Sequence, residues 1–215
     1  MDNNLLRFDK TSSFLFVDFE TFNLCLSFAH NRFWQCGMLN VVNGKIIEED
    51  NIFIKDWDCG LEIGAEAARI TKYNPYVVEK QGIYPSHAWK IISEKLDKAD
   101  YIVGHNTLNF DLYLIKDFYK MFGRDYRHLM PKMIDTNALA KAVKLGINYD
   151  KSKHASLLDF QYPLVHHVQK GLKTNLTALA KEYELNFDPE MMHDATYDLK
   201  VNIDVWDRLK FSLDI

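Results

Sequence analysis

Cysteine is scarce in this chain of 215 residues. There are three, Cys25, Cys36 and Cys59, and no two of them have a Cys-x-x-Cys spacing. An odd number of cysteines without a metal-type spacing argues against a disulfide framework and against structural zinc. We therefore expect a reducing, cytoplasmic setting.

Long apolar runs and an excess of positive charge are also missing. No stretch approaches the roughly 20 apolar residues that cross a bilayer, and Met1-Asp2-Asn3-Asn4 does not begin a signal peptide. We expect no membrane association. The formal net charge is -4, so a nucleic-acid partner would need a local basic patch or bound metal ions.

The composition that remains is that of an ordinary globular protein, with 47% hydrophobic and 26% charged residues. The chain has no internal repeat, low-complexity tract or linker that would divide it. We expect residues 1–215 to form a single domain with a full hydrophobic core.

The stretch Phe14–Phe22 predicts a buried strand that carries two acidic residues. Four apolar residues lead into Asp18, Phe19, Glu20 and Thr21, which is typical of a strand buried on both faces. Residues i and i+2 of a strand point to the same side, so Asp18 and Glu20 lie side by side. Their oxygens suit Mg²⁺ or Mn²⁺; the alternative is a strand that runs into solvent with hydrated acids.

The remaining periodicity predicts an α/β fold. Strand-like runs at 33–42 and 45–54 flank Asn43-Gly44, a strong hairpin signal. Residues 56–83 are less regular, and 146–171 lacks periodicity and is a candidate insertion. We expect three antiparallel strands, then α/β units that complete a mixed central sheet flanked by helices. The expected later elements are helices at 85–97, 110–122, 136–145 (capped by Thr136), 174–183 and 195–211, and short strands at 101–103 and 133–134.

Two further stretches carry candidate chemistry. The first, 104–111, follows a short strand and ends in Asp111, which the dipole of the following helix favours in its first turn. The second, 193–198, begins the last helix. His193 and Asp198 can face one site only if His193 lies in the loop before that helix; otherwise His193 or Asp194 is a cap and Asp198 a solvated acid.

Taken together, the three stretches resemble the exonuclease motifs of the DEDD superfamily, His subtype. The matching residues are Asp18-x-Glu20, His105-Asn106 with Phe110-Asp111, and His193-x4-Asp198, in the family's order across nearly the whole chain. Members include exonuclease I, proofreading exonuclease subunits and ribonuclease T.

The resemblance implies a ribonuclease H-like fold and a 3′–5′ exonuclease. It also implies two Mg²⁺ or Mn²⁺ ions held by Asp18, Glu20, Asp111 and Asp198, with His193 as general base. Such ions activate water and stabilise the leaving oxygen, and a neutral imidazole can accept the water proton. Asp135, in an Asp-Thr pair common in the family, is expected to support the site without binding metal.

Two departures from the family pattern stand beside these matches. Asn23 occupies a position where many relatives have glycine, although asparagine also tolerates positive φ. The family's Gly-Ile-Thr-x-Glu signature is present only as Arg69-Ile70-Thr71-Lys72-Tyr73, without the acid. The usual contacts of this segment with the strand end are therefore in doubt.

Substrate contacts are expected at motif residues and at a basic segment. We predict contacts from Thr21, Phe22, His105, Asn106 and Asn109. Phe22 and Leu24 either wedge against the terminal base or belong to the core. Between residues 141 and 173 lie six lysines with interleaved aromatics, which suit a single strand; Lys151 and Lys153 are the candidates there, the alternative being a loop whose aromatics fold back on the core.

The predicted function is release of nucleoside monophosphates from single-stranded 3′ ends, DNA favoured over RNA. Three alternatives remain: an RNA-trimming enzyme with the same residues, an inactive relative that binds nucleic acid or a polymerase, and a metal-dependent endonuclease on the same fold. The sequence specifies neither a polymerase partner nor an oligomeric state.

Overall fold

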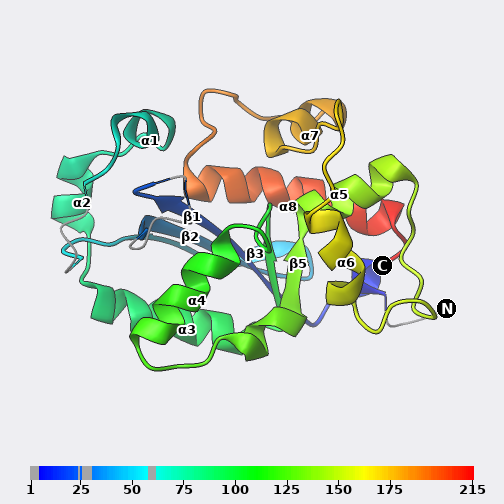
Figure 1. The fold of residues 1–215 in the computed structure, drawn as a ribbon, viewed down its shortest axis with the longest axis horizontal. Helices are drawn as coiled ribbons and strands as arrows, with labels where there is room; N and C mark the ends of the chain where they lie inside the picture. The colour runs from blue at the N-terminus through cyan, green and yellow to red at the C-terminus, as the bar shows by residue number, and fades with distance from the viewer. Residues whose placement is uncertain (1–4, 24, 26–30, 58–61) are drawn as a thin grey trace.

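The fold is built on a five-stranded sheet. The computed structural model describes residues 5–23, 25, 31–57 and 62–215. The strand order is β3-β2-β1-β4-β5. β1 (Ser13–Thr21), β2 (Phe33–Val42) and β3 (Lys45–Phe53) are antiparallel neighbours, and β4 (Tyr101–Gly104) and β5 (Met133–Asp135) continue in parallel from β1. This confirms the predicted α/β fold with a mixed central sheet (Figure 1).

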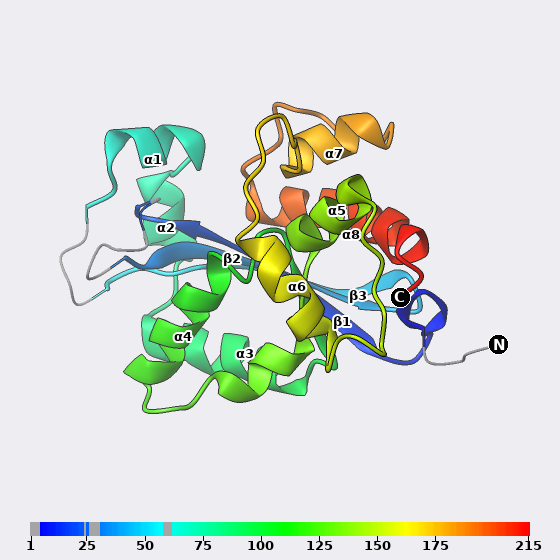
Figure 2. The same ribbon diagram turned by 45° about the vertical axis from the view of Figure 1, so that its right-hand side comes forward.

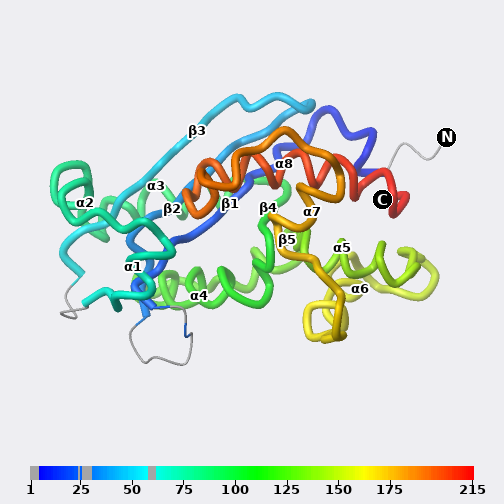
Figure 3. Tube along the Cα trace, turned by 90° about the horizontal axis from the view of Figure 1, so that it is seen from above, coloured from blue at the N-terminus to red at the C-terminus, as the bar shows by residue number. Residues whose placement is uncertain are grey.

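The predicted hairpin between β2 and β3 is also confirmed. Asn43 and Gly44 have φ values of 51° and 69°. Two consecutive left-handed residues match the strand twist and close a two-residue hairpin. The hairpin brings β3 to the outer edge of the sheet (Figure 3).

Helices cover both faces of the sheet. α8 (Ala195–Ser212) lies on one face, and α3 (Pro85–Lys98) and α4 (Asp111–Met121) lie on the other (Figures 1 and 3). Phe14 of β1 packs against Trp206 of α8 with ring centroids 6.0 Å apart. On the opposite face, Phe33 of β2 meets Phe118 of α4 at 5.1 Å. Alternation along the strands therefore decides which helix each side chain contacts.

The 56–83 segment, predicted only as irregular, contains α1 (Ala65–Ile70) and α2 (Pro75–Gln81). These helices have six and seven residues, so each buries too few side chains to show a helical period. Asn74 begins α2, since its side chain accepts from the N–H groups of Tyr76 and Val77.

The 146–171 segment, predicted to lack periodicity, contains α6 (Leu157–Val165), which flanks the β5 side of the sheet (Figure 2). Gln161 is fully buried; its Oε1 accepts from the Asp135 N–H at 2.6 Å and its Nε2 donates to the Met133 carbonyl at 3.1 Å. α6 thus satisfies backbone groups that the edge strand β5 would otherwise leave open.

α5 (Thr136–Leu145) starts with a different cap from the one expected. Asp135, not Thr136, is the N-cap, and its side chain accepts from the N–H groups of Asn137 and Ala138. A carboxylate is at least as good an N-cap as a hydroxyl, and it also complements the helix dipole. Thr136 is freed for a buried contact described below.

Three short elements complete the described chain. α7 (Leu176–Glu182) packs on α8, and 3₁₀ turns occupy Leu6–Phe8 and Arg127–Lys132. No helix within the described ranges is both long enough and apolar enough to span a membrane.

Candidate active site

The acids predicted from β1 and the last helix lie together. Asp18 and Glu20 project from the end of β1 toward α8, and Asp198 lies in the first turn of α8. One oxygen from each of the three carboxylates lies within 4.8 Å of the others. Such a group of hard oxygen donors is suited to a divalent cation such as Mg²⁺ or Mn²⁺.

Gly37, which the sequence analysis did not single out, lets α8 approach this strand end. It pairs with Asp18 across β1 and β2. A Cβ atom at Gly37 would lie 3.0 Å from the Ala195 Cβ at the start of α8. Because that contact is tighter than most Cβ contacts, glycine lets α8 approach β2 without a shift and so helps Asp198 to reach the strand acids.

Asp111, the fourth predicted acid, lies beside this group but is not part of it. It occupies the first turn of α4 and is 3% exposed. Burial raises the pKa of Asp111 well above its usual value, and the charges of Asp18 and Asp135 raise it further. Asp111 in turn raises the pKa of Glu20, so the four acids share one electrostatic environment.

The acid group resists losing its protons in the absence of a cation. Burial, followed by the charges of neighbouring acids, raises the pKa of Glu20 to about 10 and that of Asp18 to about 8. Burial is also the main reason that the pKa of Asp198 rises to about 7, although Lys72 acts in the opposite direction. Buried carboxylates that repel one another fit a divalent metal ion, because the ion replaces both the missing solvation and the missing countercharge.

His193 lies in the loop before α8, as a shared site requires. Its backbone is left-handed, with φ 67°, and its N–H donates to both carboxylate oxygens of Asp198 at 3.2 Å. Asp194 is the N-cap of α8 and accepts from Tyr197 N–H at 2.9 Å. Asp194 therefore caps the helix while its neighbour His193 lies at the candidate site, so capping by Asp194 does not exclude a role for His193 in the site.

Desolvation, followed by the charge of Lys72, lowers the pKa of the His193 imidazole below its usual value. The ring is consequently neutral near pH 7 and able to accept a proton. The ammonium of Lys72 also donates to the Glu190 carbonyl, which ties the segment after α1 to the loop that carries His193.

Asp135 holds the second motif loop in place. Its carboxylate accepts from the N–H of Asn106 at 3.1 Å and of Leu108 at 3.0 Å, in addition to capping α5. Asn106 has a positive φ of 66°, a conformation that asparagine tolerates. With its oxygens occupied by backbone donors, Asp135 has the geometry of a support for the loop rather than of a ligand.

His105 belongs to a buried polar chain behind the acids. Its Nδ1 lies 3.0 Å from the Thr136 hydroxyl, which lies 2.7 Å from Asn202 Oδ1. Burial lowers the pKa of His105 to about 4, so the ring is neutral. Asn202 was missed by sequence reasoning; the signal was a polar residue on the buried stripe of the last helix, one turn beyond Asp198.

The acids open onto a cavity of about 380 Å³ between α7 and α8. Asp18, Asp198, His105 and His193 line it, together with residues from the start of α7. A cavity of this size adjoining convergent polar groups is the usual form of a substrate site.

The residues that follow Glu20 are largely buried. Thr21 is 1% exposed and donates its hydroxyl to the Asn23 carbonyl at 2.7 Å. Phe22 is 8% exposed and packs against Tyr73 at 6.0 Å and against Trp34. Phe22 is therefore a core residue in this structure, and Tyr73 takes the position where the family signature has its acid. Leu24 lies outside the described residues.

The basic segment is packed more closely than a substrate-tracking loop requires. Lys141 donates to the Leu164 and Val165 carbonyls at 3.1 and 3.0 Å, and Lys144 binds Glu182 at 2.5 Å. These two lysines tie α5 to α6 and α7. The aromatics fold inward: Phe160 is 1% exposed and contacts Tyr149 at 5.3 Å.

Two of the lysines and one asparagine predicted to contact substrate lie on the surface. Lys151 and Lys153 are exposed in the turn before α6, and Lys153 pairs with Asp150 at 3.0 Å. Asn109 is exposed just before α4. Their contacts with substrate stay predictions.

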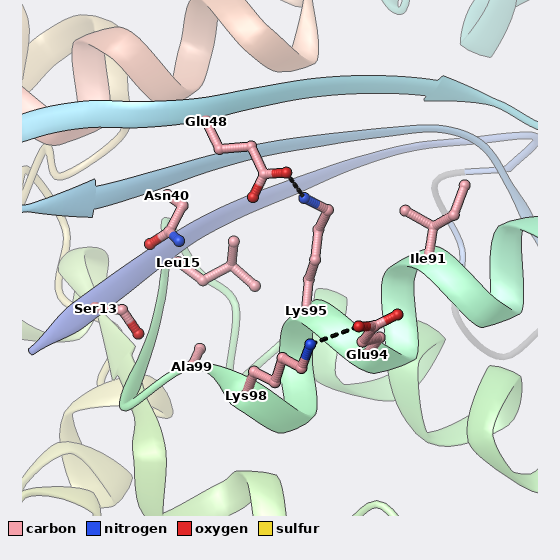
Figure 4. Close-up of a pocket in the computed structure, with 9 residues that line it drawn as sticks. All are labelled: Ser13, Leu15, Asn40, Glu48, Ile91, Glu94, Lys95, Lys98 and Ala99. Carbon is pink, nitrogen blue, oxygen red and sulfur yellow. Dashed lines mark hydrogen bonds and ion pairs between the residues drawn. The ribbon is translucent and has the colours of Figure 1, made fainter.

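A second hollow, of about 330 Å³, lies on the other face of the sheet and at the other end of β1 (Figure 4). Ser13 and Leu15 line it, and they alternate with the residues that face α8. Its charges are paired internally, since Lys95 binds Glu48 at 2.6 Å and Lys98 binds Glu94 at 2.5 Å. It has none of the uncompensated charge that marks the acid group.

Comparison with known protein families identifies the family of this chain. The RNase T family model, described as exonuclease, matches residues 15–206. The chain therefore belongs to this exonuclease family, part of the DEDD superfamily. No curated protein sequence matches the chain.

Solved structures of Escherichia coli exonuclease I have the same fold. The complex with a dT13 oligonucleotide has a TM-score of 0.70 at 21% identity and covers 93% of this chain and 41% of that one. The zinc-bound complex with single-stranded DNA gives 0.71 at 20%, covering 94% and 41%, and the dA16 complex gives 0.72 at 20%, covering 94% and 42%. The present chain thus spans about two fifths of the length of those exonuclease I chains.

Proposed function

We propose that this domain, formed by residues 1–215, is a DEDD exonuclease of the His subtype that hydrolyses phosphodiester bonds at single-stranded 3′ ends. The observation that carries the proposal is the uncompensated group Asp18, Glu20 and Asp198, with His193 hydrogen-bonded through its backbone to Asp198. The exonuclease I relatives solved with dT13 and dA16 support single-stranded DNA as the favoured substrate.

Asp18, Glu20, Asp198 and the neighbouring Asp111 would hold two Mg²⁺ or Mn²⁺ ions. When bound, such ions supply a nucleophilic water and stabilise charge on the leaving oxygen. The protein's own contribution is to hold four carboxylates on three elements, with Asp135 fixing the loop that leads to Asp111.

His193 is assigned the role of general base. It is exposed beside Asp198, and its lowered pKa keeps the imidazole neutral at physiological pH. Its backbone hydrogen bonds to Asp198 fix the position of the main chain, and His193 lines the cavity. A ring so placed can take a proton from the attacking water and pass it to solvent.

The direct test is product analysis with the purified protein. A 5′-labelled DNA strand, its RNA equivalent and a closed single-stranded circle are incubated with Mg²⁺ or Mn²⁺. The proposal expects a ladder shortened from the 3′ end, nucleoside monophosphates as product and an uncut circle. Faster RNA shortening would make it a 3′ exoribonuclease, cutting of the circle an endonuclease, and binding without cleavage an inactive nucleic-acid or polymerase-binding relative.

A cytoplasmic location is part of the proposal, on the ground of the low cysteine content and lack of metal-type cysteine spacing.

A further inference from the structure

A third hollow, of about 430 Å³, lies at the same end of the sheet as the acids but on the α3 and α4 side. Its lining combines a guanidinium with aromatic rings, and has no role in the chemistry described above. Its lining includes Arg32, Asp56, Trp57, Tyr84 and Phe122.

Arg32 is poised for a ligand. Its guanidinium carbon lies 5.8 Å from the centre of the Trp57 ring, and its Nη1 donates to the Asn31 carbonyl at 3.0 Å. Its Nε is buried and has no hydrogen-bond partner. In the described part of the chain Arg32 forms no ion pair with an acid, so the full charge of a planar donor remains available to a phosphate.

Two of the aromatic rings, those of Trp57 and Phe122, are held by contacts with neighbouring groups. Trp57 is anchored by its ring N–H, which donates to the Phe33 carbonyl at 3.1 Å. Phe122 is stacked on Trp89 with centroids 4.8 Å apart and an angle of 13°. Tyr84 is 53% exposed at the rim, with the Lys55 ammonium 5.8 Å from its ring centre. Fixed ring faces beside a cation are the elements that bind the bases and phosphates of single strands.

The main chain places Arg32, which lines this hollow, beside the residue that follows the acid end of β1. Phe22, two residues after Glu20, donates its N–H to the Arg32 carbonyl at 3.0 Å. We propose that this hollow binds a nucleotide unit of the single strand whose 3′ end lies at the acids, with Arg32 on a phosphate and the rings on the base. The inference rests on the proposed function for the placement of that 3′ end.

The test measures binding without metal, so that it does not depend on catalysis. Anisotropy of a 5′-fluorescein oligothymidylate is recorded in excess chelator for the wild type, Arg32→Gln and the control Arg124→Gln. Arg124 lies just beyond α4, is exposed and does not line the hollow, so its loss changes net charge equally. Arg32→Gln should raise Kd about tenfold or more, as for a lost hydrogen bond to a charged group, and lower the log–log salt slope by about 0.7; Arg124→Gln should change both far less.

Two more variants locate the base and the phosphate. The oligonucleotide should quench tryptophan fluorescence in the wild type, and Trp57→Phe, which keeps a ring in place, should lose most of that quenching. Asp56→Asn removes an exposed acid from the lining and should tighten binding. Thymidine monophosphate is the comparison ligand: quenching by it at the oligonucleotide's concentration would assign the hollow to free nucleotide and overturn the strand assignment.

The outcomes separate this proposal from the function itself. Equal weakening by Arg32→Gln and Arg124→Gln, or quenching that survives in Trp57→Phe, overturns the hollow as a nucleotide site. With metal present, Arg32→Gln should raise KM for a long strand by more than KM for a dinucleotide. A wild-type protein that binds in chelator but cleaves nothing with metal would instead overturn the exonuclease proposal.

Discussion

Two groups of carboxylates lie on the same sheet, and within the described ranges only one of them forms ion pairs with a lysine. On the α3 side, Glu48 and Asp50 of β3 flank Lys95, whose ammonium binds them at 2.6 and 2.8 Å. Figure 4 shows the ion pair of Lys95 with Glu48. At the α8 side, Asp18 and Glu20 meet Asp198 with no ion pair from any residue that the structure describes.

The pKa values show the consequence of this difference. Burial works against the charge of Lys95, yet its hydrogen bonds to Asp50 and Glu48 raise its pKa, so that cluster is stabilised by its own charges. In the other cluster, burial, followed by the charges of neighbouring acids, raises the pKa of Glu20 to about 10, that of Asp18 to about 8 and that of Asp198 to about 7, and no residue that the structure describes forms an ion pair with them. A fold that supplies a cation to one cluster and withholds it from the other leaves the second open to an external cation.

The largest expected effect comes from removing a charge in the open cluster. Asp18→Asn keeps the side-chain volume and should lower nuclease turnover by about three orders of magnitude or more, the scale on which charge-stabilising groups act. Excess chelator should do the same to the wild type. Turnover is measured on a labelled single strand, with circular dichroism to check folding; full activity in chelator would refute a metal-dependent reaction.

The next effect tests His193, which borders the open cluster without carrying a negative charge. His193→Ala should reduce turnover roughly a hundredfold, the usual contribution of a general base, and leave Mn²⁺ binding by titration calorimetry nearly unchanged.

The wild-type rate should also fall once the medium is acidic enough to protonate His193, whose pKa is lowered below its usual value by desolvation, followed by the charge of Lys72. That limb should be absent or reduced in His193→Ala. An unchanged rate and pH profile in the variant would assign the proton acceptor to another group.

A smaller effect concerns the stability of the metal-free protein. The pKa of Asp18 is raised from about 4 in an unfolded chain to about 8, so the folded state holds a proton that the unfolded state releases. The contribution of Asp18 to stability is therefore fully present below about pH 4 and is lost as pH rises from 4 to 8.

Asp18→Asn removes this loss, so in chelator it should melt higher than the wild type by about 2–4 °C at pH 8, about 1 kcal/mol, and the difference should shrink toward pH 4. Scanning calorimetry at several pH values measures it. A variant less stable than the wild type at pH 8 would mean that burial and repulsion between the carboxylates do not destabilise the metal-free protein.

The smallest effect is expected at the neutralised cluster. Lys95→Met leaves Glu48 and Asp50 without their cation, but Glu48 is half exposed, so the loss should be about 0.5–1 kcal/mol, seen as a drop of a few degrees in Tm. Nuclease turnover should stay at the wild-type value. A large loss of turnover at intact folding would show that the two clusters are coupled and would undo the comparison.

The sequence by itself determined the parts of this protein that depend on local pattern. The alternation in β1 set Asp18 and Glu20 on one side of a strand, and Asn43-Gly44 predicted a hairpin whose residues have φ values of 51° and 69°. The three motifs were enough to predict the fold and the family, because period, turn chemistry and motif spacing are readable along the chain.

Only the tertiary structure decided how those parts meet. Asp135 is the N-cap of α5, and the same carboxylate accepts a hydrogen bond from the N–H of Asn106 in the second motif loop. That loop contact links two segments and cannot be predicted from the local sequence. Phe22 lies in the core because it packs against Trp34 of the next strand and against Tyr73, about fifty residues further along the chain.

The same holds for the charges. Lys141 donates hydrogen bonds to two carbonyls at the end of α6. The hydrophobic pattern of the sequence did not predict that helix. Which carboxylate receives a lysine and which is left without one depends on residues distant in sequence, as with Lys95 and Asp50, so the difference between the two clusters exists only in the folded protein.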